Sequence, residues 1–130
     1  MIEEGRALFL QIAESVEDSI VEGSLPEEGQ APSTNELAAF YRINPATAAK
    51  GIAMLVDKGV LYKRRGIGMF VAAGARGALL QERRAAFADR YISPLVGEAR
   101  KLGLGPDELA DLVRSRAASD EASTLQEKAS

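Results

Sequence analysis

The side chains of this chain that could do chemistry are cationic and hydrogen-bonding groups suited to a polyanion. A Lys-Arg-Arg run at 63–65 is followed by Gly66 and Gly68, and Thr47 and Lys50 stand upstream in an alanine-rich stretch. Guanidinium and ammonium groups bind phosphate, and Thr and Lys side chains can reach the edges of bases in a DNA groove. These residue types together indicate nucleic-acid binding.

The positive charge is concentrated in one segment of the chain. The 130 residues carry a formal net charge of −3. Residues 31–76 hold seven basic residues against two acidic ones, net +5, while residues 1–30 are net −7 and residues 77–130 are net −1. A localised basic segment is the electrostatic footprint of a polyanion site. Chance clustering on a solvated surface is the alternative explanation.

The residue types that the sequence lacks argue against other functions. There is no cysteine and no histidine, so disulfides and thiolate sites are excluded, and a zinc site or a histidine base is not expected. No serine has a base partner in a recognisable pattern. We therefore expect no enzymatic activity and no cofactor. A signal-peptide pattern and an apolar run of about 20 residues are both missing, which predicts a cytoplasmic protein without membrane contact.

Two capped helices must position the hydrogen-bonding residues. Ser33 and Glu36 form an S-x-x-E capping box at the start of a short helix. Asn44-Pro45 begins a second helix, because Asn caps well and Pro suits the first helical position. Gly59 is placed to end it. An amphipathic helix over residues 7–22 precedes both.

A basic β-hairpin follows the two helices. The runs at 60–64 and 69–73 flank Arg65-Gly66-Ile67-Gly68, whose glycines permit a tight turn. The order of two capped helices and a hairpin predicts a winged helix-turn-helix. The predicted fold class is therefore mainly α with a small β-hairpin, followed by a short C-terminal helical dimerisation segment.

A helix-turn-helix places its second helix in the DNA major groove, N-terminal end first. Thr47 and Lys50 can then reach base edges or phosphates, and Ala46 can contact a thymine methyl group. The small residues Ala46, Ala49 and Gly51 would let the backbone approach closely. Backbone N–H groups at both helix starts can bind phosphates. The candidate DNA-binding residues are Ser33, Thr34, Asn35, Asn44, Ala46, Thr47, Lys50, Lys63, Arg64, Arg65, Gly66 and Gly68.

The rest of the chain predicts two further helices and a tail. Residues 77–102 have a helical pattern that Ser93-Pro94 should kink or split, and Pro106 starts a last helix. Residues 119–130 are polar and predict a flexible tail. The predicted organisation is a DNA-binding domain at 1–75, a two-helix dimerisation segment at 76–118 and the tail at 119–130.

The C-terminal helices carry more apolar side chains than the DNA-binding domain needs for its own core. About 40 residues of helix cannot bury both faces alone. This predicts a two-fold homodimer; the alternative is that these helices fold back on the domain and leave a monomer. The candidate dimerisation residues are Leu80, Phe87, Tyr91, Ile92, Leu95 and Leu102.

Residues 5–75 resemble the winged helix-turn-helix of GntR-family transcription regulators. The stretches that carry the resemblance are A-P-S-T-N-E-L-A at 31–38, R-I-N-P-A-T-A at 42–48 and K-G-V-L-Y-K-R-R-G-I-G-M-F-V at 58–71. The Asn-Pro-x-Thr helix start and the short C-terminal piece resemble the YtrA-like subfamily. The resemblance implies a dimeric DNA-binding regulator whose C-terminal piece dimerises and includes no large effector-binding domain.

The chain departs from the family pattern at several positions that contact DNA. Family members often carry base-reading arginines where Asn35, Pro45 and Ala49 stand, and often a basic residue where Ile67 stands. Asn35, Thr47 and Lys50 are the best substitutes. The leading hypothesis is a dimeric transcription repressor that binds a double-stranded DNA operator, with any small-molecule effector unknown. The alternative is a winged-helix protein–protein interaction module without DNA binding.

Overall fold

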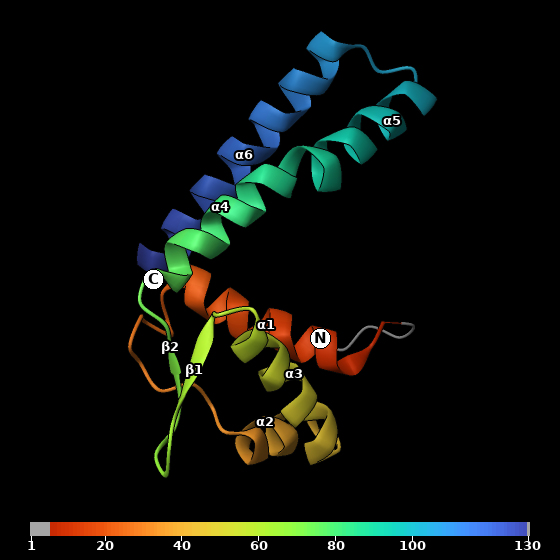
Figure 1. Cartoon of the computed structure of the whole chain (residues 1–130). Helices are drawn as coiled ribbons and strands as arrows, with labels where there is room; N and C mark the ends of the chain where they lie inside the picture. The colour runs from red at the N-terminus through yellow and green to blue at the C-terminus, as the bar shows by residue number, and fades with distance from the viewer. Residues whose placement is uncertain (1–5, 130) are drawn as a thin grey trace. The chain divides into compact units, whose positions relative to one another are not determined.

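The computed structural model describes residues 6–129, and side chains as far as residue 124. It is mainly helical with one two-stranded sheet (Figure 1). The chain divides after Arg84 into two compact units, here called the head and the C-terminal unit. The elements are α1 (Leu8–Glu22), α2 (Thr34–Tyr41), α3 (Pro45–Asp57), β1 (Leu61–Arg64), β2 (Gly68–Val71), α4 (Ala75–Phe87), a π-helical turn (Ala88–Ile92), α5 (Ser93–Lys101) and α6 (Pro106–Ala129).

The predicted caps start both short helices of the head. Ser33 Oγ accepts a hydrogen bond from the Glu36 N–H at 3.0 Å, and the Ser33 N–H donates to Glu36 Oε1 at 3.1 Å. Asn44 Oδ1 accepts from the Ala46 N–H at 2.8 Å, with Pro45 as the first residue of α3. These bonds satisfy backbone donors that a helix start leaves without partners. The capping predictions are therefore confirmed.

The hairpin is also as predicted, and a third segment extends its sheet. β1 and β2 pair antiparallel, with Leu61 opposite Val71 and Arg64 opposite Gly68. The loop before α2 runs along the other side of β2, where the Ala31 N–H donates to the Met69 carbonyl at 2.8 Å. This loop therefore holds the wing against the rest of the head.

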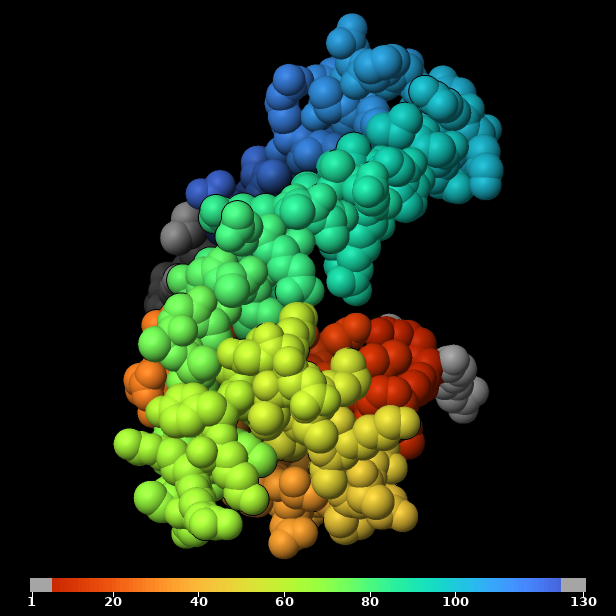
Figure 2. Space-filling model, in the orientation of Figure 1, coloured from red at the N-terminus to blue at the C-terminus, as the bar shows by residue number. Residues whose placement is uncertain are grey.

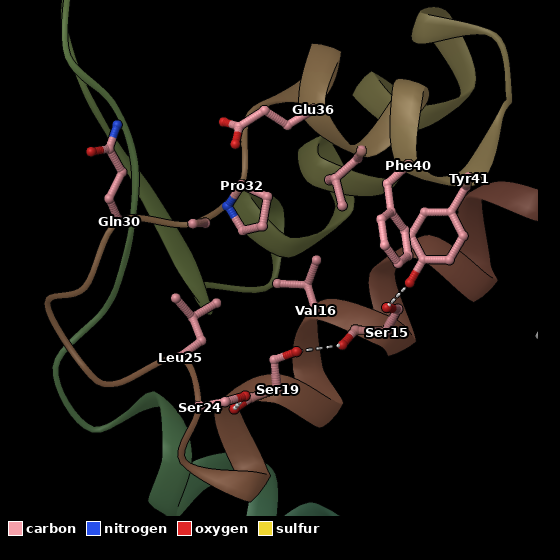
Figure 3. A pocket seen from close by; sticks show the side chains of 12 residues that line it. Ser15, Val16, Ser19, Ser24, Leu25, Gln30, Pro32, Glu36, Phe40 and Tyr41 are labelled. Carbon is pink, nitrogen blue, oxygen red and sulfur yellow. Dashed lines mark hydrogen bonds between the residues drawn. The ribbon is translucent and has the colours of Figure 1, made fainter.

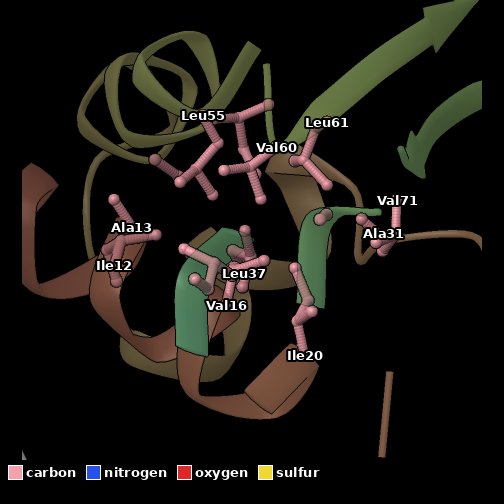
Figure 4. Close-up of a cluster of buried hydrophobic side chains, with 14 of the residues drawn as sticks. Ile12, Ala13, Val16, Ile20, Ala31, Leu37, Leu55, Val60, Leu61 and Val71 are labelled. Atoms are coloured by element: carbon pink, nitrogen blue, oxygen red, sulfur yellow. The ribbon is translucent and has the colours of Figure 1, made fainter. Parts of the chain in front are cut away.

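Side chains of α1, α3 and the hairpin meet in the core of the head (Figure 4). Ile12 and Ile20 of α1, Leu55 of α3, and Leu61 and Val71 of the strands are all at most 2% exposed. Burying each such side chain contributes about 1.5–3 kcal/mol relative to leaving it in water. This core fixes how α3 and the wing are presented.

Gly51 lies in this core and does not face solvent. A Cβ atom added there would sit 2.8 Å from the Phe9 carbonyl oxygen and 3.3 Å from Ile12 side-chain atoms. The residue is glycine because α1 and α3 approach closely at this point. The expectation that Gly51 faces DNA is therefore wrong.

The head extends further along the chain than the predicted boundary at residue 75. Leu79 on α4 is 2% exposed and belongs to the core of the head. Arg83 on the same helix donates to Asp18 on α1 at 2.6 Å. The first turns of α4 are thus part of the head, and the unit ends at Arg84.

A π-helical turn in the C-terminal unit accommodates Pro94. The Ser93 N–H donates to the Ala88 carbonyl, five residues back. Proline has no N–H and its ring crowds the preceding turn, so a widened turn lets the helix continue into α5. The predicted kink or split at Ser93-Pro94 therefore takes the form of a π-helical turn.

The last helix is longer than predicted. α6 runs from Pro106 to Ala129, whereas the sequence predicts a flexible tail from residue 119; residue 130 lies outside the described part. Residues 119–129 include Ala, Glu, Leu, Gln and Lys, which have high helix propensity. The side chains of residues 119–124 are all exposed, so a polar composition is compatible with helix there. Within residues 6–129, no helix is both long and apolar enough to cross a membrane.

Candidate nucleic-acid interface

The N-terminal half of α3 presents the predicted recognition residues. Ala46, Ala49 and Lys50 are exposed and Thr47 is half-buried, while Ala48 is buried beneath them. The alanine side chains are short, so the helix backbone can come close to the floor of a groove about 12 Å wide. The helix thus has one face in the core and one available to a ligand.

Lys50 has a partner that the sequence did not predict. Its ammonium nitrogen lies 4.0 Å from the centroid of the Phe9 ring on α1. Such a cation–π contact is worth about 0.5–1 kcal/mol at an exposed site. Phe9 therefore positions the Lys50 charge beside α3.

The wing carries three exposed cationic side chains, those of Lys63, Arg64 and Arg65. Successive side chains of a strand point to opposite faces, so Lys63 and Arg64 lie on opposite faces of the hairpin. The Arg64 guanidinium carbon lies 4.8 Å from the centroid of the Phe70 ring. Tyr62, on the same face, donates a hydrogen bond to the Glu28 carboxylate, which raises the pKa of that phenol.

The turn of the wing is held by Gln30, which the sequence patterns did not single out. Gln30 Nε2 donates to the Ile67 carbonyl at 3.1 Å. A Cβ atom added to Gly68 would sit 2.7 Å from that nitrogen, and Gly68 has a φ of +147°. Backbone conformation therefore favours glycine at both positions, and a side chain at Gly68 would also displace the Gln30 amide, whereas Gly66, at φ +77°, has open space around it. Nothing in the local sequence could reveal this contact, because the partners are far apart in the chain.

The start of α2 contributes a polar edge. Ser33 and Asn35 are exposed and Thr34 is half-buried. The backbone N–H of Ser33, and then its hydroxyl, lowers the pKa of the Glu36 carboxyl group. Glu36 thus stays ionised while it secures the helix start that offers N–H groups to an anion.

The structure separates structural cations from surface cations in the basic segment. Lys58 Nζ donates to Glu17 at 2.8 Å and to Glu82 at 3.0 Å. Partial desolvation opposes the charge of Lys58, but these hydrogen bonds and carboxylates together raise its pKa. Arg76 donates to the Val21 carbonyl at 3.1 Å. Both residues therefore hold the head together and are not candidates for binding DNA.

Arg42 joins the candidate set. It is an exposed cation in the turn between α2 and α3, where it adopts a φ of +56°. The net charge of its segment is the only sequence signal that could have found it.

These parts share one edge of the head. The start of α2, the N-terminal end of α3 and the turn of the wing all lie along the lower edge in the ribbon and space-filling views (Figures 1 and 2). The elements that carry the predicted residues thus meet at this edge, and Gly51 is excluded because it is buried. Their contact with DNA remains a prediction.

Comparison with known proteins identifies the fold. The family model described as "Bacterial regulatory proteins, gntR family" matches residues 8–71. A crystal structure of a GntR-family protein from Bacteroides thetaiotaomicron is 30% identical, with a TM-score of 0.68, and the match covers 88% of this chain and 99% of that one. The chain belongs to the GntR family.

Two further relatives extend this GntR assignment. The HTH-type transcriptional regulator YhcF of Bacillus subtilis is 24% identical over 110 residues, covering 85% of this chain and 89% of YhcF. The N-terminal domain of AraR, whose structure is in complex with mutant ORR3, is 31% identical with a TM-score of 0.51, covering 54% of this chain and all of that domain. The winged helix-turn-helix fold predicted from the sequence is thus confirmed.

Proposed function

We propose that this GntR-family transcription regulator is a dimeric repressor that binds operator DNA through the edge formed by α2, α3 and the wing. The observation that carries the proposal is the convergence of the capped α3, the capped α2 and the basic wing on that edge (Figure 2). α3 would enter the major groove while the wing contacts the neighbouring backbone.

Charge supports this use of the edge. Lys63, Arg64 and Arg65 of the wing are exposed, as are Arg42 in the turn before α3 and Lys50 on α3, whose ammonium group lies over the Phe9 ring of α1. A protein that neutralises phosphates releases counterions, so its affinity falls steeply with salt. Six to ten phosphate contacts per dimer would lower the affinity by about 10³ to 10⁵ between 50 and 200 mM salt.

The C-terminal unit supports dimerisation. Phe87, Tyr91, Ile92, Leu95 and Leu102 are between 40% and 67% exposed. Leu80, the remaining candidate, is half-buried and lies in the head. Pairing through the apolar side chains of the C-terminal unit would remove them from water and hold two heads for two half-sites about one DNA turn apart.

DNase footprinting on the region upstream of its own gene tests the operator proposal, followed by in vitro transcription from that region. The expected result is a protected palindrome and less transcript as protein is added. Protection without any loss of transcript would contradict repression. DNA affinity that does not change with salt would contradict electrostatic binding by the edge.

A further inference from the structure

A pocket on the head has the size and lining of a small-molecule site. It has a volume of about 730 Å³ and lies between α1, α2 and the loop that joins them. Small-molecule sites occupy about 300–1,000 Å³. Figure 3 shows Phe40 and Leu25 on opposite sides of the pocket, with Ser15 and Ser19 along α1.

The apolar part of the lining is incompletely covered. Phe40 is 75% exposed, although its edge packs on Tyr41 with ring centroids 4.9 Å apart. Leu25 is half-buried. A ligand with an apolar body that covered the Phe40 ring would remove this surface from water.

The polar part of the lining consists of hydroxyls, the Gln30 amide and one carboxylate. Ser15 and Tyr41 share a hydrogen bond between their hydroxyls, and Ser19 Oγ donates to the Ser15 carbonyl at 3.3 Å. Hydroxyl oxygens that already donate can still accept. Of the described residues that line the pocket, Glu36 alone is charged. The lining therefore favours a ligand that donates hydrogen bonds and carries positive charge.

We propose that this pocket binds a small amphipathic primary amine, with its ammonium group at Glu36 and its apolar body against Phe40 and Leu25. Glu36 Oε1 already accepts the Ser33 N–H, and Oε2 can accept the ammonium group. An ammonium placed there is attracted by a carboxylate that no cationic side chain of the lining neutralises.

Two residues that line the pocket also hold elements of the edge that binds DNA in the proposed function. Glu36 secures the start of α2 through Ser33, and Gln30 holds the turn of the wing through the Ile67 carbonyl. Both residues line the pocket. A bound amine that pulls on either side chain shifts α2 or the wing and weakens DNA binding, and by linkage DNA weakens binding of the amine. This coupling rests on the proposed function; the binding site does not.

NMR titration of the full chain with 2-phenylethylamine tests the site, with 2-phenylethanol as the neutral control. Ligands of this size bind with Kd on the order of millimolar, so the titration extends to about 10 mM. The expected result is amide shifts at Ser19, Leu25 and Phe40, with an affinity for the alcohol that is about two- to fivefold weaker. No shifts at these residues, or equal shifts with both compounds, would overturn the proposal.

Glu36→Gln is the decisive variant because glutamine also completes a capping box and so keeps the start of α2. The variant should lose about two- to fivefold in affinity for the amine and leave the weak binding of the alcohol unchanged. Unchanged amine affinity would overturn the role of Glu36.

Operator affinity measured with and without 2-phenylethylamine then tests the coupling. If the amine lowers the operator affinity of the wild-type chain, and lowers it less in the Gln30→Ala variant, the coupling runs through the wing. Equal operator affinity with and without the amine overturns the coupling. The NMR shifts decide the site even if the protein binds no operator.

Discussion

The head and the C-terminal unit differ in where they place their apolar side chains. The head buries most of its large aliphatic residues, of which Ile12, Ile20 and Val71 have no exposed surface, although Ile67 on the wing is 62% exposed. In the described part of the C-terminal unit, Ala99 is the one buried residue, at 4% exposed, while Tyr91 and Leu102 are more than half exposed. The head therefore forms a core of its own, whereas the C-terminal unit leaves large apolar side chains in contact with water.

Removal of the C-terminal unit should have the largest effect on DNA binding. A chain that ends at Arg84 keeps the core of the head, including Leu79, but loses the proposed dimer contacts. Linking two binding modules raises avidity by about 10² to 10⁴, and the truncation should lose that much operator affinity. Fluorescence anisotropy on full and half operators measures it. If truncation lowers the affinity for a half operator as much as for the full operator, the truncated head itself is damaged.

A core substitution should separate the two regions by stability. Leu55→Ala in the head should lower the free energy of unfolding by about 2–5 kcal/mol, because it leaves a cavity. Leu102→Ala, at a side chain 67% exposed, should leave the stability of the head within about 0.5 kcal/mol. Urea denaturation followed by circular dichroism measures both. Similar losses would mean that Leu102 also belongs to a core.

Substitutions on the edge should divide specificity from general affinity. Thr47→Val should cost about 1–3 kcal/mol on the operator and less on random DNA if Thr47 contacts a base. Arg64→Ala should weaken all sequences about equally and flatten the salt dependence. Arg116→Ala, an exposed cation of the C-terminal unit, is the matched control. Operator preference that survives the Thr47 change would place the readout elsewhere.

The smallest expected effect concerns the start of α2. Ser33→Ala should lower the free energy of unfolding by about 1 kcal/mol.

The pKa of Glu36 is lower in the folded state than in the unfolded chain. The contribution of Glu36 to the free energy of unfolding is therefore present above the ordinary glutamate pKa, about 4.3, and is lost as pH falls through the folded value. In the Glu36→Gln variant, the free energy of unfolding should therefore fall less steeply as pH is lowered. A series of unfolding curves at different pH values measures this. The same pH dependence in the variant and the wild-type chain would rule out a contribution of ionised Glu36 to stability.

Local patterns in the sequence predicted most of the head. The S-x-x-E box, Asn44-Pro45 and the glycine turn each encode a backbone feature within a few residues, and all three formed. The contacts of Gln30 with Ile67 and of Lys50 with Phe9 join distant segments, so periodicity and capping rules could not reveal them.

Composition was a weaker guide. The net charge of the basic segment included Lys58 and Arg76, which bind groups within the head. Gly51 was small because of packing between helices. The residues from 119 onward were assigned to a tail although Ala, Glu, Leu, Gln and Lys among them have high helix propensity. In each case the residue type was visible in the sequence, but its partner was not.

Sedimentation velocity of the full chain with a labelled operator duplex tests most directly whether the head binds DNA while the C-terminal unit pairs. We expect a dimer at micromolar concentration and two chains on each operator. A complex with one chain per operator, or a free monomer that binds the full operator as tightly as the half operator, would contradict it.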